Sequence, residues 1–195
     1  MNAAFRLALT SLAIAGYASS PYPSARAQQV HEASDRATGE RAMQVTKPSD
    51  TEILIVRSFD APREVVFAAL TRPEDLRKWI TPANMTLVAC EVDLRAGGML
   101  RYVFELAGSK RVEVRDTYTI VNPPADLAFV ESYDFSPLKI SVVVSLMPAG
   151  RMRTVFTQRL TYGSQRERDQ DFGPVTTSAE AGYARLDRYL ASIAR

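Results

Sequence analysis

Three polar side chains interrupt apolar faces in this chain, and they are its candidates for chemistry. Asp116, Glu131 and Gln158 each take a position in a period-two pattern whose neighbours on the same face are apolar or aromatic. A charged group facing a dry core is costly, so it must be paired, neutralised or hydrated. A water-containing cavity would explain all three, and two carboxyl groups in it can act as acid and base. Alternatively, a β-bulge reverses the local parity and places each group in solvent.

The same apolar faces are rich in aromatic side chains, which commonly line pockets for small molecules. Together with the three polar groups they give a set of candidate ligand-binding residues. The set comprises Trp79, Tyr102, Phe104, Asp116, Tyr118, Phe129, Glu131, Tyr133, Phe156, Gln158, Tyr183 and Leu186. The alternative for most of the apolar members is core packing alone. Trp79 can wall a cavity mouth or simply fasten its helix to the sheet.

The scarcity of histidine and cysteine excludes several kinds of site. His31, the only histidine, lies outside the predicted domain, which excludes a histidine-ligated metal and Ser-His-Asp catalysis there. Cys90, the only cysteine, excludes an internal disulfide and has the place of a small buried hydrophobe. Ala96-Gly97-Gly98 joins two strands, so it is not a phosphate-binding loop. We expect no metal and no cofactor, and no catalytic residue is identified.

Length and charge set further bounds. A chain of 195 residues with 46% hydrophobic and 24% charged residues suffices for one domain with a sizeable core. The formal net charge of +2, without a long basic run, excludes nucleic acid as a partner. The chain is expected to be a monomer or a weak homodimer, without a stable membrane span once its N-terminal segment is removed.

Two short helices after a first strand are predicted to position the single tryptophan. Residues 52–59 have the composition of a strand buried on both faces. Asp60 is a candidate N-cap, with Pro62 in the first turn of the helix that follows. Residues 71–74 (TRPE) fit a capping box that starts a second helix, and Pro82 ends it.

The remaining chain is predicted to form a sheet and one covering helix. From Asn84 the apolar pattern has period two, and turn residues divide it into six further strands of an antiparallel meander. A helix is predicted from Ser178, a plausible N-cap, nearly to the C-terminus. A sheet with one apolar face needs a cover. This helix is the only predicted element long enough to provide it.

The N-terminal segment has the features of an export signal. Arg6, an apolar run too short to cross a bilayer and Ala25-Arg26-Ala27 predict a signal peptide at residues 1–27. Residues 28–50 are polar and aperiodic, which predicts a disordered linker. The chain is therefore expected to be periplasmic or secreted. The alternative is a cytoplasmic protein whose translation starts at Met43.

Several motifs resemble those of a known superfamily. They are residues 59–62 (FDAP), 79–82 (WITP) and 91–98 (EVDLRAGG), and Tyr118 followed by 122–127 (NPPADL). With the terminal helix they resemble the START-like (SRPBCC, Bet v 1-like) superfamily, and within it the activators of heat-shock chaperone ATPase. The resemblance covers about residues 51 to 193. It implies an α+β helix-grip fold at 51–195, in which a curved antiparallel sheet of about seven strands surrounds the long C-terminal helix and leaves a cavity.

Three functions are compatible with this fold, which does not by itself determine activity. The first is binding of a small apolar or amphipathic molecule between the sheet and the terminal helix. The second is a cavity enzyme, such as a cyclase or hydrolase, that uses Asp116 or Glu131. The third is a co-chaperone that contacts a heat-shock ATPase through its surface, against which export argues. A polar-lined cavity would favour the first two, and an exposed apolar patch the third.

Overall fold

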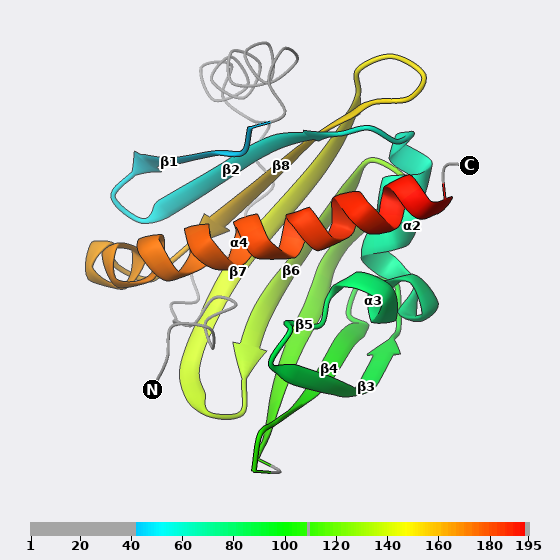
Figure 1. Cartoon of the computed structure of the whole chain (residues 1–195). Helices are drawn as coiled ribbons and strands as arrows, with labels where there is room; N and C mark the ends of the chain where they lie inside the picture. The colour runs from blue at the N-terminus through cyan, green and yellow to red at the C-terminus, as the bar shows by residue number, and fades with distance from the viewer. Residues whose placement is uncertain (1–41, 109, 194–195) are drawn as a thin grey trace.

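An antiparallel sheet curves around one long helix in the computed structural model, which describes residues 42–108 and 110–193 (Figure 1). Eight strands follow the order β1-β2-β8-β7-β6-β5-β4-β3 across the sheet. The strands are β1 (Gln44–Ser49), β2 (Glu52–Phe59), β3 (Met85–Val92), β4 (Met99–Leu106), β5 (Arg111–Asn122), β6 (Asp126–Tyr133), β7 (Ser136–Pro148) and β8 (Thr154–Thr161). The helices are α2 (Arg63–Thr71), α3 (Pro73–Trp79) and α4 (Gln165–Ile193). The predicted α+β helix-grip fold is confirmed.

Strand β1 corrects two expectations, the count of about seven strands and the linker at residues 28–50. It pairs with β2 through Thr46 opposite Leu54, so the short helices follow the second strand of the described chain. Val45 packs against the core while most of β1 is exposed, as an edge strand permits. The sequence pattern did not predict β1 because its residues are mostly polar and include Pro48. The predicted signal peptide and the linker up to residue 41 lie outside the described residues.

Helix α4 starts thirteen residues before the predicted start at Ser178, at Gln165. The Ser164 hydroxyl oxygen accepts a hydrogen bond from the Glu167 backbone N–H at 3.3 Å, which stabilises the first turn. The helix continues through Pro174. The residue before a proline usually avoids the helical region because its Cβ meets the proline ring. Gly173 has no Cβ, so this obstacle is absent.

The two predicted helices are present, but their predicted caps are not. Neither helix has a side-chain hydrogen bond at its N-cap, where Pro62 and Arg72 stand. The Asp60 carboxylate lies 3.4 Å from the Arg153 guanidinium. The Thr71 hydroxyl donates to the Phe67 carbonyl at 2.7 Å, one turn back in the same helix. Helix starts were therefore recognised correctly while the groups thought to cap them have other partners.

The β3–β4 hairpin is bonded to the centre of β5. The Gly97 N–H donates to the Tyr118 carbonyl at 2.8 Å, and the Tyr118 N–H donates to the Gly98 carbonyl at 2.9 Å. Gly97 has a φ of +79°, which favours glycine. A Cβ atom at position 98 would lie 2.1 Å from the Asp93 carbonyl oxygen. The hairpin therefore excludes a side chain at position 98 and favours glycine at position 97, and it holds the backbone of Tyr118.

Gly98→Ala is expected to lower the free energy of unfolding by about 2 kcal/mol or more, because backbone must move to admit the new methyl group. Urea denaturation measures this change. Gly97→Asn is the matched control, because asparagine tolerates a positive φ and no atom would lie within 4 Å of its Cβ. It should cost less than about 1 kcal/mol. Equal losses for the two variants would contradict the predicted clash at Gly98.

Candidate ligand-binding cavity

A cavity of about 140 Å³ lies between the sheet, α3 and α4. This is close to the volume of the engineered apolar cavity of about 150 Å³ that admits benzene. Its lining residues are Leu70, Leu76, Trp79, Ile80, Leu100, Tyr102, Asp116, Tyr118, Leu127, Phe129, Glu131, Val144, Phe156, Gln158, Leu160, Val175, Ser178, Ala179, Gly182, Tyr183 and Arg185. The walls are predominantly apolar, as in most small-molecule sites.

Asp116 and Glu131 are direct neighbours across strands β5 and β6. Side chains opposite each other in an antiparallel pair have Cβ atoms about 5 Å apart. Both carboxyl groups line the cavity. The register shifts between β5 and β6 fall later, between Tyr118 and Ile120, so no bulge intervenes before Asp116. The cavity interpretation of Asp116 and Glu131, and likewise of Gln158, is therefore the one that the geometry supports.

Burial governs the charge of this carboxyl pair. The Asp116 side chain is almost wholly enclosed, and burial raises its pKa from 3.8 to about 8. Burial also raises the pKa of Glu131 well above its ordinary value, and the neighbouring Asp116 and Asp171 carboxyl groups raise it further. Asp116 is therefore largely protonated at neutral pH, and burial favours the neutral form of Glu131 as well. Each can then donate one hydrogen bond as well as accept.

Hydrogen bonding leaves part of the polar end of the cavity unsatisfied. The Tyr133 hydroxyl donates to Glu131 Oε1, and the Tyr183 hydroxyl donates to Gln158 Oε1. In contrast, the Tyr118 hydroxyl and Asp116 Oδ1 have no hydrogen-bonding partner among the described residues. Buried polar atoms are normally paired, so each such exception needs an explanation. A bound molecule or cavity water would satisfy both.

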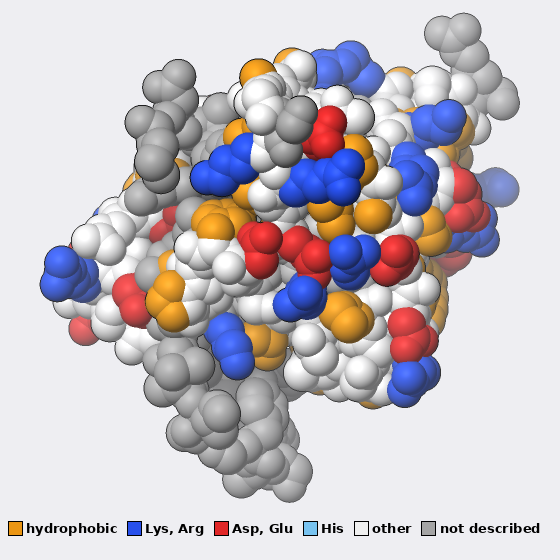
Figure 2. Space-filling model, turned by 90° about the horizontal axis from the view of Figure 1, so that it is seen from below, with side chains coloured by type: hydrophobic (Ala, Val, Ile, Leu, Met, Phe, Trp, Pro, Cys, Tyr) orange, Lys and Arg blue, Asp and Glu red, His pale blue; other side chains and the backbone are white. Residues whose placement is uncertain are grey.

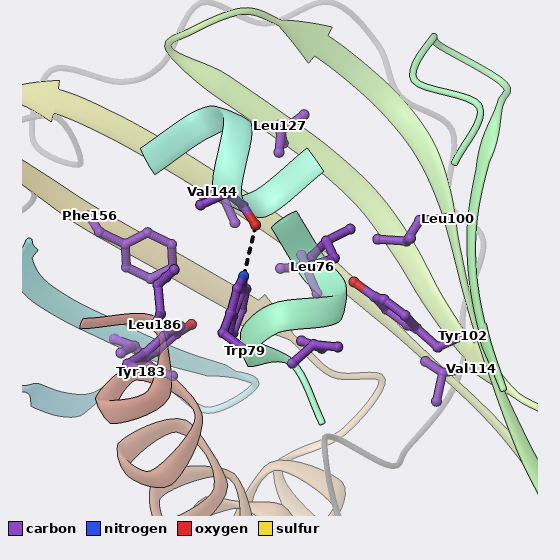
Figure 3. Close-up of a cluster of buried hydrophobic side chains, with 14 of the residues drawn as sticks. Leu76, Trp79, Leu100, Tyr102, Val114, Leu127, Val144, Phe156, Tyr183 and Leu186 are labelled. Atoms are coloured by element: carbon purple, nitrogen blue, oxygen red, sulfur yellow. Dashed lines mark hydrogen bonds between the residues drawn. The ribbon is translucent and has the colours of Figure 1, made fainter. Parts of the chain in front are cut away.

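Trp79 lines the cavity, as one interpretation expected, but it fastens its helix to α2 and not to the sheet. Its indole N–H donates to the Ala69 carbonyl at 2.8 Å, which fastens α3 to α2 (dashed line in Figure 3). Its ring also lines the cavity. Figure 3 shows Trp79 and Leu76 between Tyr102 on one side and Phe156 and Tyr183 on the other. The two short helices thus position the tryptophan as a wall between the sheet and α4.

Arg185 closes the same wall from α4, and the sequence pattern did not single it out. Its guanidinium donates to the carbonyls of Trp79 at 2.8 Å and Ile80 at 3.4 Å, at the end of α3. The Tyr189 hydroxyl adds a bond to Asp75 in the first turn of α3. These contacts hold α3 against α4. Arg185 stands off the apolar stripe of its helix, so its position could not mark it as part of a site.

Arg57 is a second charged residue whose role sequence alone did not show. It is buried on β2, where it forms an ion pair with Asp187 of α4. Its guanidinium lies 4.5 Å from the centre of the Phe59 ring. It is not among the cavity-lining residues. Arg57 therefore fastens α4 to the sheet beside the site without forming its wall.

The cavity wall includes most of the candidate residues, but not three of them. Those that line it are Trp79, Tyr102, Asp116, Tyr118, Phe129, Glu131, Phe156, Gln158 and Tyr183. Phe104 instead stacks on Tyr102, with ring centres 5.9 Å apart, and Leu186 is fully buried. Tyr133 does not line the cavity, but its hydroxyl donates to the lining residue Glu131. Period-two alternation identifies the inward face of a strand, but not how far along the strand the packed core gives way to space.

Two further features constrain the site. Among the described residues, no cluster of three histidine, cysteine, aspartate or glutamate side chains could hold a metal ion. None of the described helices is both long and apolar enough to cross a membrane.

Comparison with solved structures identifies the same fold in several bacterial proteins. A protein from Rhodobacter sphaeroides is 26% identical, with a TM-score of 0.71 over 78% of this chain and 99% of that one. A protein from Mycobacterium smegmatis is 23% identical, with a TM-score of 0.65 over 76% and 97%. CalU16 from Micromonospora echinospora is 23% identical, with a TM-score of 0.53 over 77% and 85%. No curated protein matches the chain.

A family comparison is more specific. The sequence profile described as "Activator of Hsp90 ATPase homolog 1-like protein" matches residues 60–191. This range starts at the end of β2 and includes both short helices, the meander and nearly all of α4. It therefore includes every residue that lines the cavity. The chain belongs to the activator of Hsp90 ATPase homolog 1-like family of the START-like superfamily.

Proposed function

We propose that this protein binds a small apolar or amphipathic molecule in the cavity between the sheet and α4. The observation that carries the proposal is the combination of apolar walls with a polar end whose Tyr118 hydroxyl and Asp116 Oδ1 have no partner among the described residues. Apolar walls supply binding energy, and a few placed polar groups fix the orientation of a ligand. The volume of about 140 Å³ suits a molecule of the size of one substituted ring.

The face seen in Figure 2 gives less support to a co-chaperone role. Figure 2 shows hydrophobic side chains dispersed among Lys, Arg, Asp and Glu over the described part of the face in view. Single exposed hydrophobic residues are normal on proteins, whereas interaction sites usually form contiguous apolar patches. An enzyme remains the second candidate, because Asp116 and Glu131 lie opposite each other in the cavity and burial raises the pKa of both carboxyl groups. Such a pair can supply a general acid.

Gly182 gives a direct test of cavity binding. It lines the cavity on α4, and the nearest atom to a Cβ placed there would be Arg185 Nη2 at 3.8 Å. Gly182→Leu should fill the cavity and abolish binding of α-methylstyrene, an apolar one-ring probe, to the folded protein. The single tryptophan supplies one indole N–H resonance at the cavity wall, so an NMR titration reports binding directly.

Gly182→Ala is the matched control for this experiment. It adds one methyl group to a helix interior, so it should raise the free energy of unfolding by about 0.5–1 kcal/mol. It should retain binding of α-methylstyrene. A wild-type protein that shows no change in the Trp79 indole resonance would contradict the proposed function. Equal binding by wild type and the folded Gly182→Leu variant would place the probe outside this cavity.

We propose further that the protein is exported, on the pattern of residues 1–27 alone. Native mass spectrometry of protein from its own host, with sequencing of the mature N-terminus, tests export and binding together. A chain that starts at Gln28 and retains a small molecule is the expected result. A chain that starts at Met43 would overturn export while leaving the cavity proposal open to the titration above.

A further inference from the structure

The polar end of the cavity contains hydrogen-bond donors that lack acceptors, and this constrains the ligand. Tyr118 is 2% exposed, its hydroxyl has no partner among the described residues, and it lines the cavity. A buried O–H without an acceptor loses its hydrogen bond to water and gains nothing in return. Its ring is fixed by the Phe129 ring, with ring centres 6.2 Å apart in an edge contact. An acceptor atom of a ligand would satisfy this O–H.

Asp116 presents the second group, two residues earlier on the same strand face. Alternate residues of a strand are about 7 Å apart and point to the same side. The Asp116 carboxyl group contributes to raising the pKa of Tyr118, so the two groups lie within electrostatic reach. As a protonated acid, Asp116 can donate one hydrogen bond. An oxygen atom with two lone pairs can accept from both Tyr118 and Asp116.

The surroundings of Asp116 disfavour a charged ligand. The titratable or charged groups associated with this end come from β3, β4, β6 and α4. They are Cys90, Tyr102, Glu131, Asp171 and Arg185. Arg185 uses its guanidinium on the carbonyls of Trp79 and Ile80. An ammonium ion would lose its hydration among the apolar walls. To pair with it, a carboxyl group of the cavity would have to release its proton and become charged.

We propose that the ligand of this cavity is an uncharged apolar molecule with a carbonyl-type acceptor oxygen, which accepts hydrogen bonds from the Tyr118 hydroxyl and the Asp116 carboxylic acid. This inference rests on the proposed binding function. Recognition is by hydrogen-bond donation at one end and by apolar contact elsewhere. Glu131 differs from Asp116 because one of its oxygens already accepts from the Tyr133 hydroxyl.

Acetophenone and α-methylstyrene form a matched pair of probes, because they share one shape and differ by an oxygen atom in place of a methylene group. Wild-type protein should bind both. Tyr118→Phe should weaken acetophenone binding about tenfold, and leave α-methylstyrene binding within about twofold, because only the first ligand loses a hydrogen bond. NMR titration measures the affinity of both proteins for both ligands. The change that Tyr118→Phe causes is then compared between the ligands, so their different hydration cancels. An equal effect on the two ligands would overturn the proposal.

The dependence on pH separates Asp116 from a purely structural role. The preference for acetophenone over α-methylstyrene should fall as the pH rises from about 6 to about 9, because the ionised carboxylate no longer donates. Asp116→Asn keeps a donor at every pH, so its preference should change less than that of the wild type, and Glu131 accounts for any remaining dependence. A constant preference in the wild-type protein would overturn the role of Asp116. This test uses the wild-type protein alone, so it does not depend on the folding of a variant.

The outcomes distinguish the two proposals. Failure of α-methylstyrene to bind contradicts the proposed function itself. If α-methylstyrene binds and Tyr118→Phe changes the affinities for the two ligands by the same factor, only the acceptor-oxygen inference is contradicted. Tighter binding of 1-phenylethylammonium than of acetophenone would assign the carboxyl pair to a cationic ligand and would also overturn that inference.

Discussion

Asp116→Asn is expected to remove much of a loss of stability that the wild-type protein shows as the pH rises from about 4 to about 8. Burial raises the pKa of Asp116 from 3.8 to about 8 in the folded protein. Between these values the folded state binds a proton that the unfolded state has released. The free energy of unfolding therefore falls with rising pH, because the unfolded state binds fewer protons. A pKa shift of this size lowers the free energy of unfolding by on the order of 5 kcal/mol once the pH has risen past both pKa values.

Urea denaturation at a series of pH values measures this effect. Asparagine has nearly the shape of aspartate and does not ionise, so the variant should have a flatter profile than the wild type above about pH 5. Burying the asparagine amide lowers the free energy of unfolding by the same amount at every pH. This loss shifts the whole stability curve of the variant without changing its slope. Glu131, whose pKa burial also raises, contributes a remaining slope in the same direction. Parallel curves for wild type and variant would show that Asp116 is not buried as an acid.

Glu113 provides a control of opposite sign on the same strand. It lies three residues before Asp116 and pairs with Arg101 at 2.8 Å. The hydrogen bond from Arg101 holds the pKa of Glu113 below its ordinary value. The stability that ionised Glu113 contributes is fully present above its pKa in the unfolded chain. This stability is lost as the pH falls through its lower pKa in the folded protein. Glu113→Gln should therefore reduce stability at neutral pH and converge with the wild type in acid.

The inward faces of β5 and β7 could be predicted from sequence because buried and more exposed residues alternate along most of both strands. Val112, Val114, Asp116 and Tyr118 are all buried, and the residues between them are more exposed. An acid that keeps the parity of buried neighbours must be placed with them unless a bulge intervenes. The bulge is present, but it follows Tyr118, and Ile120 is 45% exposed as a result. Sequence gave no sign of where it would occur.

Other features depend on contacts between distant segments, which a local pattern does not contain. Strand β1 is polar and is defined by its pairing with β2 and by Val45 against the core. Arg57 interrupts the apolar pattern of β2, and its partner Asp187 is 130 residues away on α4. Arg185 is recognisable only when α3 and α4 are seen side by side. The cavity itself is a volume that several elements leave unfilled, and no single segment encodes it.

Trp79→Ala is expected to have a large effect on stability, with a loss of about 4 kcal/mol in the free energy of unfolding. The side chain is 5% exposed, and its removal leaves a void beside an existing cavity of about 140 Å³. It also leaves the Ala69 carbonyl without the indole donor at 2.8 Å. The surrounding helices cannot collapse onto the space without breaking the Arg185 bonds to the end of α3. Thermal and urea denaturation both measure the loss.

Trp79→Phe separates the ring from its hydrogen bond. Phenylalanine keeps an aromatic wall but cannot donate to Ala69, so the expected loss is about 1 kcal/mol from the hydrogen bond plus a smaller packing cost. If Trp79 is mainly a wall of the cavity, Trp79→Phe should keep binding of α-methylstyrene while Trp79→Ala weakens it. Because both variants lack the indole resonance, the signals of the ligand itself are followed in this titration. If it acts mainly by fastening α3 to α2, the two variants should lose similar stability. The ratio of the two losses therefore decides which of its two contacts holds the site together.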